Sequence, residues 1–328
     1  MARLVAAFGS SHSIMLAATR EDWISRFRES DQRMPLYDRE GVERSYAELL
    51  AQAPKDAAEI VTEDAMVSAY QRTFDSIAEL KRQIDATALD VLIIAGDDQH
   101  ELFLDTMMPS LAIYYGATIR NAARRDVPRD NWYRVAQMQR LEPETDAHYP
   151  VQAGLALHFI TGLIGRGFDV CAVGGLVGEQ YEGHAYSYIH RTYLGGRSLS
   201  VVPLLLNTYY PPNPITPKRC VALGRELKTL IEAYPEDLRV GIIASGGLSH
   251  FVVDEELDRG VIDALKTKDL NYLAGLEPKR LQAGSSEIRS WIVTAAAAAD
   301  LDLKWLSYIP AYRTPALTGI GLGFARWS

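Results

Sequence analysis

The stretch VGIIASGGLSH (240–250) decides the fold, because a short apolar run, 240–244, stops abruptly at small and polar residues. Four other runs follow the same rule. They are 4–8 before GSSH, 91–95 before GDDQH, 168–173 before GG and 199–206 before NTYYPP. Near-continuous runs of Val, Ile and Leu are typical of strands buried on both faces of a sheet. The sequence therefore predicts a buried sheet of several such strands.

Helical patterns lie between these runs. Residues 62–86 place apolar side chains on one stripe, and residues 217–233 open with Thr216 as a candidate N-cap and Pro217 at the first helical position. Strands that alternate with helices predict an α/β fold with a central, mostly parallel sheet flanked by helices. Without an internal repeat or a linker, the whole chain, 1–328, is expected to form a single domain.

Two stretches, about 25–57 and 118–150, are rich in charges and prolines and are expected to be surface insertions. The second contains four arginines: Arg120, Arg124, Arg125 and Arg129. A solvated, partly helical insertion is the favoured interpretation. The alternative is a lid whose arginines meet an anionic substrate or a partner subunit.

Charge and composition narrow the class of protein. With 42 acidic and 34 basic side chains among 328 residues, the net charge of −8 argues against a nucleic-acid partner. The two cysteines, Cys171 and Cys220, favour a reducing compartment. No apolar run reaches the roughly 18 residues of a membrane span. A cytoplasmic protein without a membrane segment is therefore expected.

Chemically active side chains follow three of the predicted strands. These are His12, the cluster at 97–101 and His250. Ligands of open α/β sheets bind beyond the carboxyl ends of the strands. A single histidine there is more often a hydrogen-bonded loop residue, but three together favour a metal or acid–base site. The paired glycines of SGGLSH would let the backbone approach a ligand closely and His250 project into the pocket.

Two smaller patterns remain open to more than one interpretation. Ser249 beside His250 suggests a serine hydrolase only weakly, because adjacent residues rarely form a nucleophile–base pair and no G-x-S-x-G motif occurs. Glu287, in AGSSEIRSW (283–291), is either a first-turn acid that complements a helix dipole or the carboxylate of an iron site with two neutral ligands. Spacing alone does not choose between these roles of Glu287.

Longer segments resemble a known family, the class III extradiol ring-cleaving dioxygenases of the protocatechuate 4,5-dioxygenase catalytic β-subunit type. The similar segments are SSH (10–12), LDVLIIAGDDQHELF (89–103), MMPSLAIYYG (107–116), the nearly gap-free run 204–251, GSSEIRSWIVTAAA (284–297) and SYIPAYRTPALTGIGLGF (307–324). Together they cover most of the chain.

The resemblance implies roles for individual residues. His12 and Glu287 would be iron ligands, His250 the active-site acid–base, and His184 a histidine outside the ligand set that contacts substrate. Where the family has its second histidine ligand, this chain has Gln99.

That departure leaves three possibilities for the second ligand. Gln99 binds iron through its amide oxygen, a one-residue slip brings His100 or Glu101 inward, or the metal is lost. Strand alternation places residues 99 and 101 on one side and favours Gln99, with His100 in reserve.

The implied activity is that of an Fe(II)-dependent extradiol dioxygenase, which opens a vicinal dihydroxy-aromatic or dihydroxypyridine-type ring with O2. The alternatives are a metal-dependent hydrolase that uses Zn²⁺ and a non-catalytic metal- or ligand-binding homologue. A homo-oligomer is expected, with a small partner subunit as a further possibility. Five tyrosines are candidates for an aromatic pocket: Tyr181, Tyr186, Tyr188, Tyr209 and Tyr210.

Overall fold

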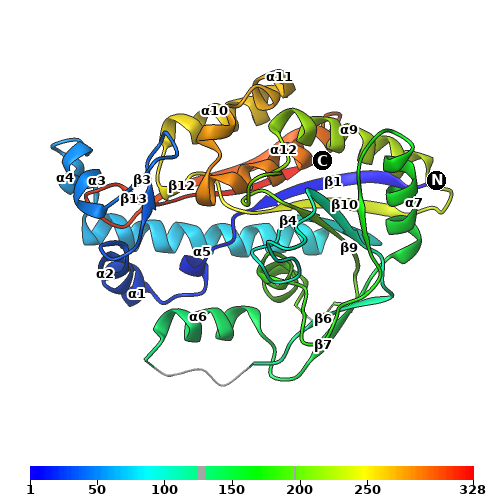
Figure 1. The fold of residues 1–328 in the computed structure, drawn as a ribbon, viewed down its shortest axis with the longest axis horizontal. Coiled ribbons are helices and arrows are strands. Elements are labelled where there is room, and N and C mark those ends of the chain that lie inside the picture. Colours follow the sequence, from blue (N-terminus) through cyan, green and yellow to red (C-terminus); the bar gives the residue numbers. More distant parts are fainter. Residues whose placement is uncertain (125–129, 196) are drawn as a thin grey trace.

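A computed structural model describes residues 1–124, 130–195 and 197–328. In these ranges the main feature is a nine-stranded mixed sheet with the order β11-β13-β1-β10-β4-β9-β5-β8, in which β12 also pairs with β13 (Figure 1). The strands are β1 (Arg3–Ser10), β4 (Val91–Asp97), β5 (Leu111–Tyr114), β8 (Cys171–Val173), β9 (Ser200–Leu206), β10 (Arg239–Ser245), β11 (His250–Val252), β12 (Leu303–Tyr312) and β13 (Thr318–Trp327).

The four strands at the centre of the sheet, β1, β10, β4 and β9, are parallel to one another. The strands toward the edges change direction, because β13 is antiparallel to β1 and β5 is antiparallel to β9. All four central strands therefore end at the same edge. The predicted single-domain α/β fold with a mostly parallel central sheet is confirmed.

Helices cover both faces of the sheet, and side chains alternate between the two cores. From β4, Val91 and Ile93 face one core whereas Leu92 and Ile94 face the other, and all four are buried. The first core is closed by α7 (Ala153–Ile164), α9 (Pro217–Ala233), α10 (Glu255–Thr267), α11 (Leu270–Ala274) and α12 (Ile288–Ala297). The opposite core is closed by α1 (Arg20–Ile24), α2 (Arg26–Asp31), α5 (Glu63–Ala86) and α8 (His184–Ile189) (Figure 1).

Both predicted helices are present. Thr216 caps α9 by accepting a hydrogen bond from the Arg219 N–H, with Pro217 in the first turn, and Thr62 caps α5. The predicted strand at 168–173 is shorter than expected. The Phe168 N–H donates to the Leu163 carbonyl in the turn after α7, so the chain becomes extended only at Cys171.

The two predicted insertions carry small elements of their own. Residues 25–57 contain α2, β2 (Leu36–Tyr37), β3 (Glu43–Arg44) and α3 (Tyr46–Gln52), before α4 (Ala57–Ile60). Among the described residues of 118–150, β6 (Thr118–Asn121) pairs antiparallel with β7 (Ala147–Pro150), and α6 (Trp132–Leu141) lies between them in the sequence.

Two of the four arginines in the second insertion have partners close by. Arg120 donates to the Gln180 carbonyl and pairs with Asp146, and Arg124 donates to the Glu142 carbonyl. Arg125 and Arg129 lie outside the described residues.

Across the described ranges, no helix combines the length and the apolar character that crossing a membrane requires.

Candidate metal centre and active site

The carboxyl edge of the parallel strands gathers six buried or half-buried histidine and acidic side chains. His12 follows β1, Asp97 is the last residue of β4, and Glu101 lies in the loop after it. His184 opens α8, and His250 begins β11. Glu287 ends the 3-10 turn Ala283–Glu287 before α12. Parallel strands therefore bring together residues that are up to 275 positions apart, His12 and Glu287.

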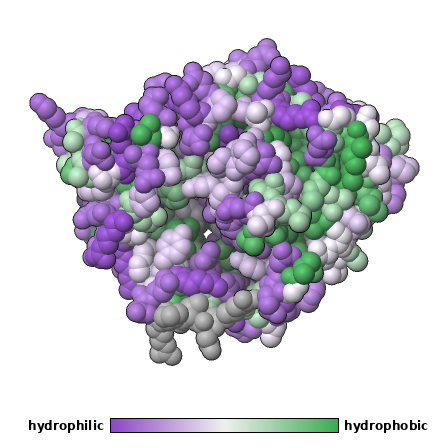
Figure 2. Space-filling view, viewed as in Figure 1, coloured by the Kyte–Doolittle hydropathy of each residue, from purple (hydrophilic) through white to green (hydrophobic). Residues whose placement is uncertain are grey.

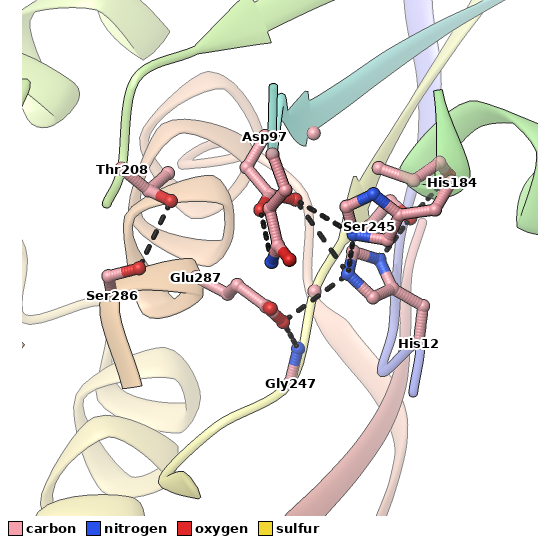
Figure 3. Close-up of polar contacts among 12 residues, drawn as sticks. His12, Asp97, His184, Thr208, Ser245, Gly247, Ser286 and Glu287 are labelled. Carbon is pink, nitrogen blue, oxygen red and sulfur yellow. Dashed lines mark hydrogen bonds and ion pairs between the residues drawn. The ribbon is translucent and has the colours of Figure 1, made fainter. Parts of the chain in front are cut away.

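At the centre of this group the rings of His12 and His184 meet edge to face (Figure 3). Their Nε2 atoms are 3.1 Å apart. The Asp97 Oδ1 atom lies 3.7 Å from each Nε2, and the Glu287 Oε2 atom lies 3.5 Å from His12 Nε2. Two imidazoles and two carboxylates thus converge on one small region.

Hydrogen bonds on the far side of each ring fix its orientation. The Ser245 hydroxyl donates to the Ala185 carbonyl, so its oxygen accepts from His12 Nδ1–H at 3.0 Å. His184 Nδ1–H donates to Glu101 Oε1 at 2.6 Å. With both Nδ1 atoms acting as donors, each Nε2 is left to present a lone pair, as a metal-ligating histidine does.

Two facing lone pairs repel unless a cation lies between them. Without a metal, a proton on His184 serves this purpose. Burial alone would lower the pKa of His184, but the carboxylates of Glu101 and Asp97 outweigh it and raise the pKa to about 10. Burial opposes ionisation of Glu101 too, yet the His184 charge and hydrogen bond lower its pKa to about 2. The site is therefore built to hold positive charge.

The donors also fit a divalent metal. The two Nε2 atoms, 3.1 Å apart, are close enough that both would bind one divalent ion at the usual metal–nitrogen distance of about 2.1 Å. Asp97 is fully buried, and its Oδ1 has no hydrogen-bond partner. A buried carboxylate oxygen without a donor is costly unless a cation compensates it.

His250 stands beside these donors. Its Nδ1 atom lies 2.9 Å from the Leu248 carbonyl, and its Nε2 atom lies 3.3 Å from Glu287 Oε1. Burial would lower the pKa of His250, but the charge and hydrogen bond of Glu287 raise it. His250 can therefore carry a proton at Nε2, at the wall of the cavity.

Glycines make room for His250 and Glu287 rather than for a ligand. A Cβ atom on Gly247 would lie 2.8 Å from His250 Cε1, and one on Gly284 would lie 1.8 Å from His250 Cδ2. A Cβ atom on Gly246 would lie 2.8 Å from the Glu287 Cβ. The paired glycines of SGGLSH thus let the side chains of His250 and Glu287 pack closely against the backbone.

Gln99 and His100 lie in different surroundings. The Gln99 side chain lines the cavity, and its Nε2 donates to Asp97 Oδ2 at 3.1 Å. His100 has a left-handed backbone (φ 65°), stacks on Tyr210 and contacts Asp105, and it is not among the residues that line the cavity. The backbone turn at His100 carries its ring away from His12.

The side chains open onto a cavity of about 340 Å³. In the space-filling view, a narrow hollow is visible near the middle of this face (Figure 2). The aromatic lining of the 340 Å³ cavity comes from Tyr133 of α6 together with Tyr181, Tyr188 and Phe251. Of the other candidate tyrosines, Tyr186 is buried and donates to the Leu204 carbonyl, and neither Tyr209 nor Tyr210 lines the cavity.

The sequence analysis placed Asp97 in the candidate cluster at 97–101 without a role of its own, and it considered Glu101 individually only as a result of a strand slip. Asp97 is the last residue of β4, so alternation along that strand was an available signal for it. Glu101 lies in the loop beyond the strand, where alternation does not apply. The hydrogen bond between Ser245 and His12 could not be predicted from the sequence, because it depends on the register of β1 against β10.

Comparison with known proteins assigns the chain to a family. Residues 60–323 match the model of the catalytic LigB subunit of aromatic ring-opening dioxygenase. Because that match covers most of the chain, the protein belongs to this family, and the resemblance to class III extradiol dioxygenases is confirmed.

Two individual proteins are also similar. A gallate dioxygenase of Pseudomonas putida is 31% identical over 140 residues, which cover 37% of this chain and 38% of the relative. The match thus spans well under half the length of that relative. A crystal structure of an uncharacterized protein from Escherichia coli K12 aligns with a TM-score of 0.44 at 11% identity, covering 77% of this chain and 92% of that chain.

Proposed function

We propose that the protein is an Fe(II)-dependent extradiol dioxygenase that opens the ring of a vicinal dihydroxy-aromatic or dihydroxypyridine-type substrate. One observation carries the proposal: two imidazole Nε2 atoms, 3.1 Å apart, meet buried carboxylates at the wall of an aromatic-lined cavity. Family membership and the similarity to a gallate dioxygenase support the same chemistry.

His12 and Glu287 are the ligands that the family resemblance assigns, and their donor atoms lie 3.5 Å apart. Imidazole nitrogen with carboxylate oxygen is the donor mixture of non-haem iron oxygenases. When bound, the ion supplies Lewis-acid and redox chemistry toward the two substrate oxygens and dioxygen.

His250 is the acid–base residue of the proposal. Its unprotonated Nε2 atom takes a proton from a substrate hydroxyl, and the imidazolium so formed, which Glu287 Oε1 stabilises, later returns the proton to an oxygen atom that came from O2. Glu287 Oε1 and the Leu248 carbonyl hold the imidazole in place from its two nitrogens. Tyr181, Tyr188 and Phe251 supply the aromatic walls against which a ring would pack.

The reaction balances without another oxidant or reductant. The carbon–carbon bond next to the two hydroxylated carbons breaks, and both atoms of O2 enter the product as a carboxylate and a carbonyl oxygen. The four electrons that dioxygen accepts come from the substrate. The product is a ring-opened semialdehyde-type acid.

Oxygen uptake tests the proposal. The protein is loaded with Fe(II) without air and offered catechols, gallate-like acids and dihydroxypyridines in an oxygen electrode, with ¹⁸O2 for product mass. One O2 consumed per ring opened is expected, with one label retained in the new carboxylate, because the label in the new carbonyl exchanges with water. Hydrolysis without oxygen uptake would support a Zn²⁺ hydrolase instead, and absence of any turnover would support a binding homologue.

The predicted homo-oligomer, the small partner subunit and the cytoplasmic location stay predictions. Sedimentation of the purified protein, alone and with proteins co-purified from its source, measures the first two.

A further inference from the structure

The buried oxygen of Asp97 is the observation that the family pattern does not explain. Asp97 is fully buried, and its Oδ1 is without a hydrogen-bond partner while it lies 3.7 Å from both His12 Nε2 and His184 Nε2. Its other oxygen, Oδ2, accepts from Gln99. One oxygen is therefore anchored, and the other points at the two imidazoles.

The orientation of Gln99 follows from this contact. Only the NH2 group of an amide can donate to a carboxylate, so the Gln99 nitrogen faces Asp97. Its backbone N–H donates to Glu101 Oε2, which fixes the loop. The Gln99 side chain thus behaves as a support of Asp97.

His184 occupies the position of a ligand. Glu101 holds its Nδ1 from behind, at 2.6 Å, in the carboxylate–histidine arrangement that orients metal-binding imidazoles. Its Nε2 is as close to His12 Nε2 as neighbouring ligands of one ion are.

We propose that this chain binds its metal with His184 and Asp97, together with His12 and Glu287, and that Gln99 is a positioning residue for Asp97 rather than a ligand. That a metal binds at all is taken from the proposed function, and the inference concerns which residues bind it. Its physical basis is that the missing imidazole at position 99 is replaced by a carboxylate two residues earlier and by the histidine that opens α8.

Metal affinity, measured without substrate or O2, tests the proposal. Metal-free protein is titrated with Co(II), whose visible spectrum reports the ligand set, and Fe(II) content is measured after anaerobic loading. We expect Asp97→Asn and His184→Gln each to weaken Co(II) binding at least about 100-fold and to change the spectrum, since each removes a ligand. Gln99→Ala should weaken binding about tenfold, which is typical of losing a hydrogen bond that orients a metal ligand.

Two matched controls distinguish the loss of a metal ligand from a general loss of structure. Asp105→Asn and His148→Gln change the same residue types at exposed positions and should leave Co(II) affinity unchanged. Circular dichroism of each metal-free variant verifies its fold.

A double variant separates support from ligation. If Gln99 acts through Asp97, Gln99→Ala should cost no further affinity in the Asp97→Asn background, whereas two direct ligands would give two separate losses. Metal lost with Gln99→Ala but retained with Asp97→Asn and His184→Gln would overturn the inference. Such a result would not contradict the proposed dioxygenase activity. Conversely, the expected losses of metal affinity without any oxygen uptake would contradict the proposed activity and leave the ligand assignment in place.

Discussion

At the scale of single residues, the site depends on side chains held from two directions. His250 is fixed at Nδ1 by the Leu248 carbonyl and at Nε2 by Glu287. We predict that His250→Gln retains metal content and lowers turnover by about 10²–10⁴-fold, the usual range for losing a general acid–base. Metal analysis and steady-state kinetics measure both quantities. His158→Gln, distant in α7, is the control, and equal loss of metal and activity would make His250 a ligand.

Close packing against Gly284 restricts the position of the His250 ring, as its hydrogen bonds do. Because a Cβ atom on Gly284 would lie 1.8 Å from His250 Cδ2, we predict that Gly284→Ala displaces the imidazole and lowers turnover at least about tenfold. Gly175→Ala is the matched control, since nothing lies within 4 Å of its Cβ position. Full activity of Gly284→Ala would show that the ring tolerates displacement.

At the scale of elements, the start of α12 determines where Glu287 lies. Arg289 is buried and donates to the carbonyls of Ile215, Thr208 and Leu281, which ties α12 to the segment after β9. Trp291 Nε1–H donates to the Gly246 carbonyl and ties the same helix to the end of β10. These contacts place Glu287 Oε2 against the Gly247 N–H.

We predict that Arg289→Met destabilises the protein by about 3 kcal/mol, because it leaves several buried carbonyls without donors. Arg289→Lys retains one charged donor, so its free energy of unfolding should lie between those of Arg289→Met and the wild type. Urea unfolding measures the free energies. A loss below about 0.5 kcal/mol for Arg289→Met would mean that water replaces the guanidinium at these carbonyls.

At the scale of the whole molecule, the metal should stabilise the fold, since it would bind a site that exists only when strands and helices have met. At a thousand-fold excess over Kd, binding adds about 4 kcal/mol. For a chain of this length we predict a rise in Tm of about 6 °C. Calorimetry of metal-free and loaded protein measures the shift, with His12→Ala as the control. An equal rise in that variant would place the effect at another site.

The segment at 118–150 contributes to the cavity through α6, because Tyr133, Gln137 and Leu141 line it. We predict that Tyr133→Ala and Leu141→Ala raise KM for the aromatic substrate about tenfold, the cost of about 1.4 kcal/mol of lost contact, with metal content unchanged. Gln139→Ala, exposed on the same helix, is the control. An unchanged KM would indicate that this segment is a solvated insertion that does not contact the substrate.

The sequence by itself determined the local structure and the positions of the strand ends. Apolar runs such as 91–95 and 240–244 predict buried strands, because exposing their side chains to water would raise the free energy of the folded protein. Capping at Thr216 and Pro217 located α9 because both residues act on their immediate neighbours. Since parallel strands end together, His12 and His250 were also expected at one edge.

Which atoms meet at that edge depends on contacts between elements that are distant in the sequence. The pairing of β1 with β10 brings Ser245 to His12, and the entry of α8 brings His184 to the same point. The backbone turn at His100, with its positive φ, sends that ring away and leaves Gln99 beside Asp97. Sequence patterns report periodicity along one element, whereas contacts of about 3 Å between elements depend on register and packing across the whole sheet.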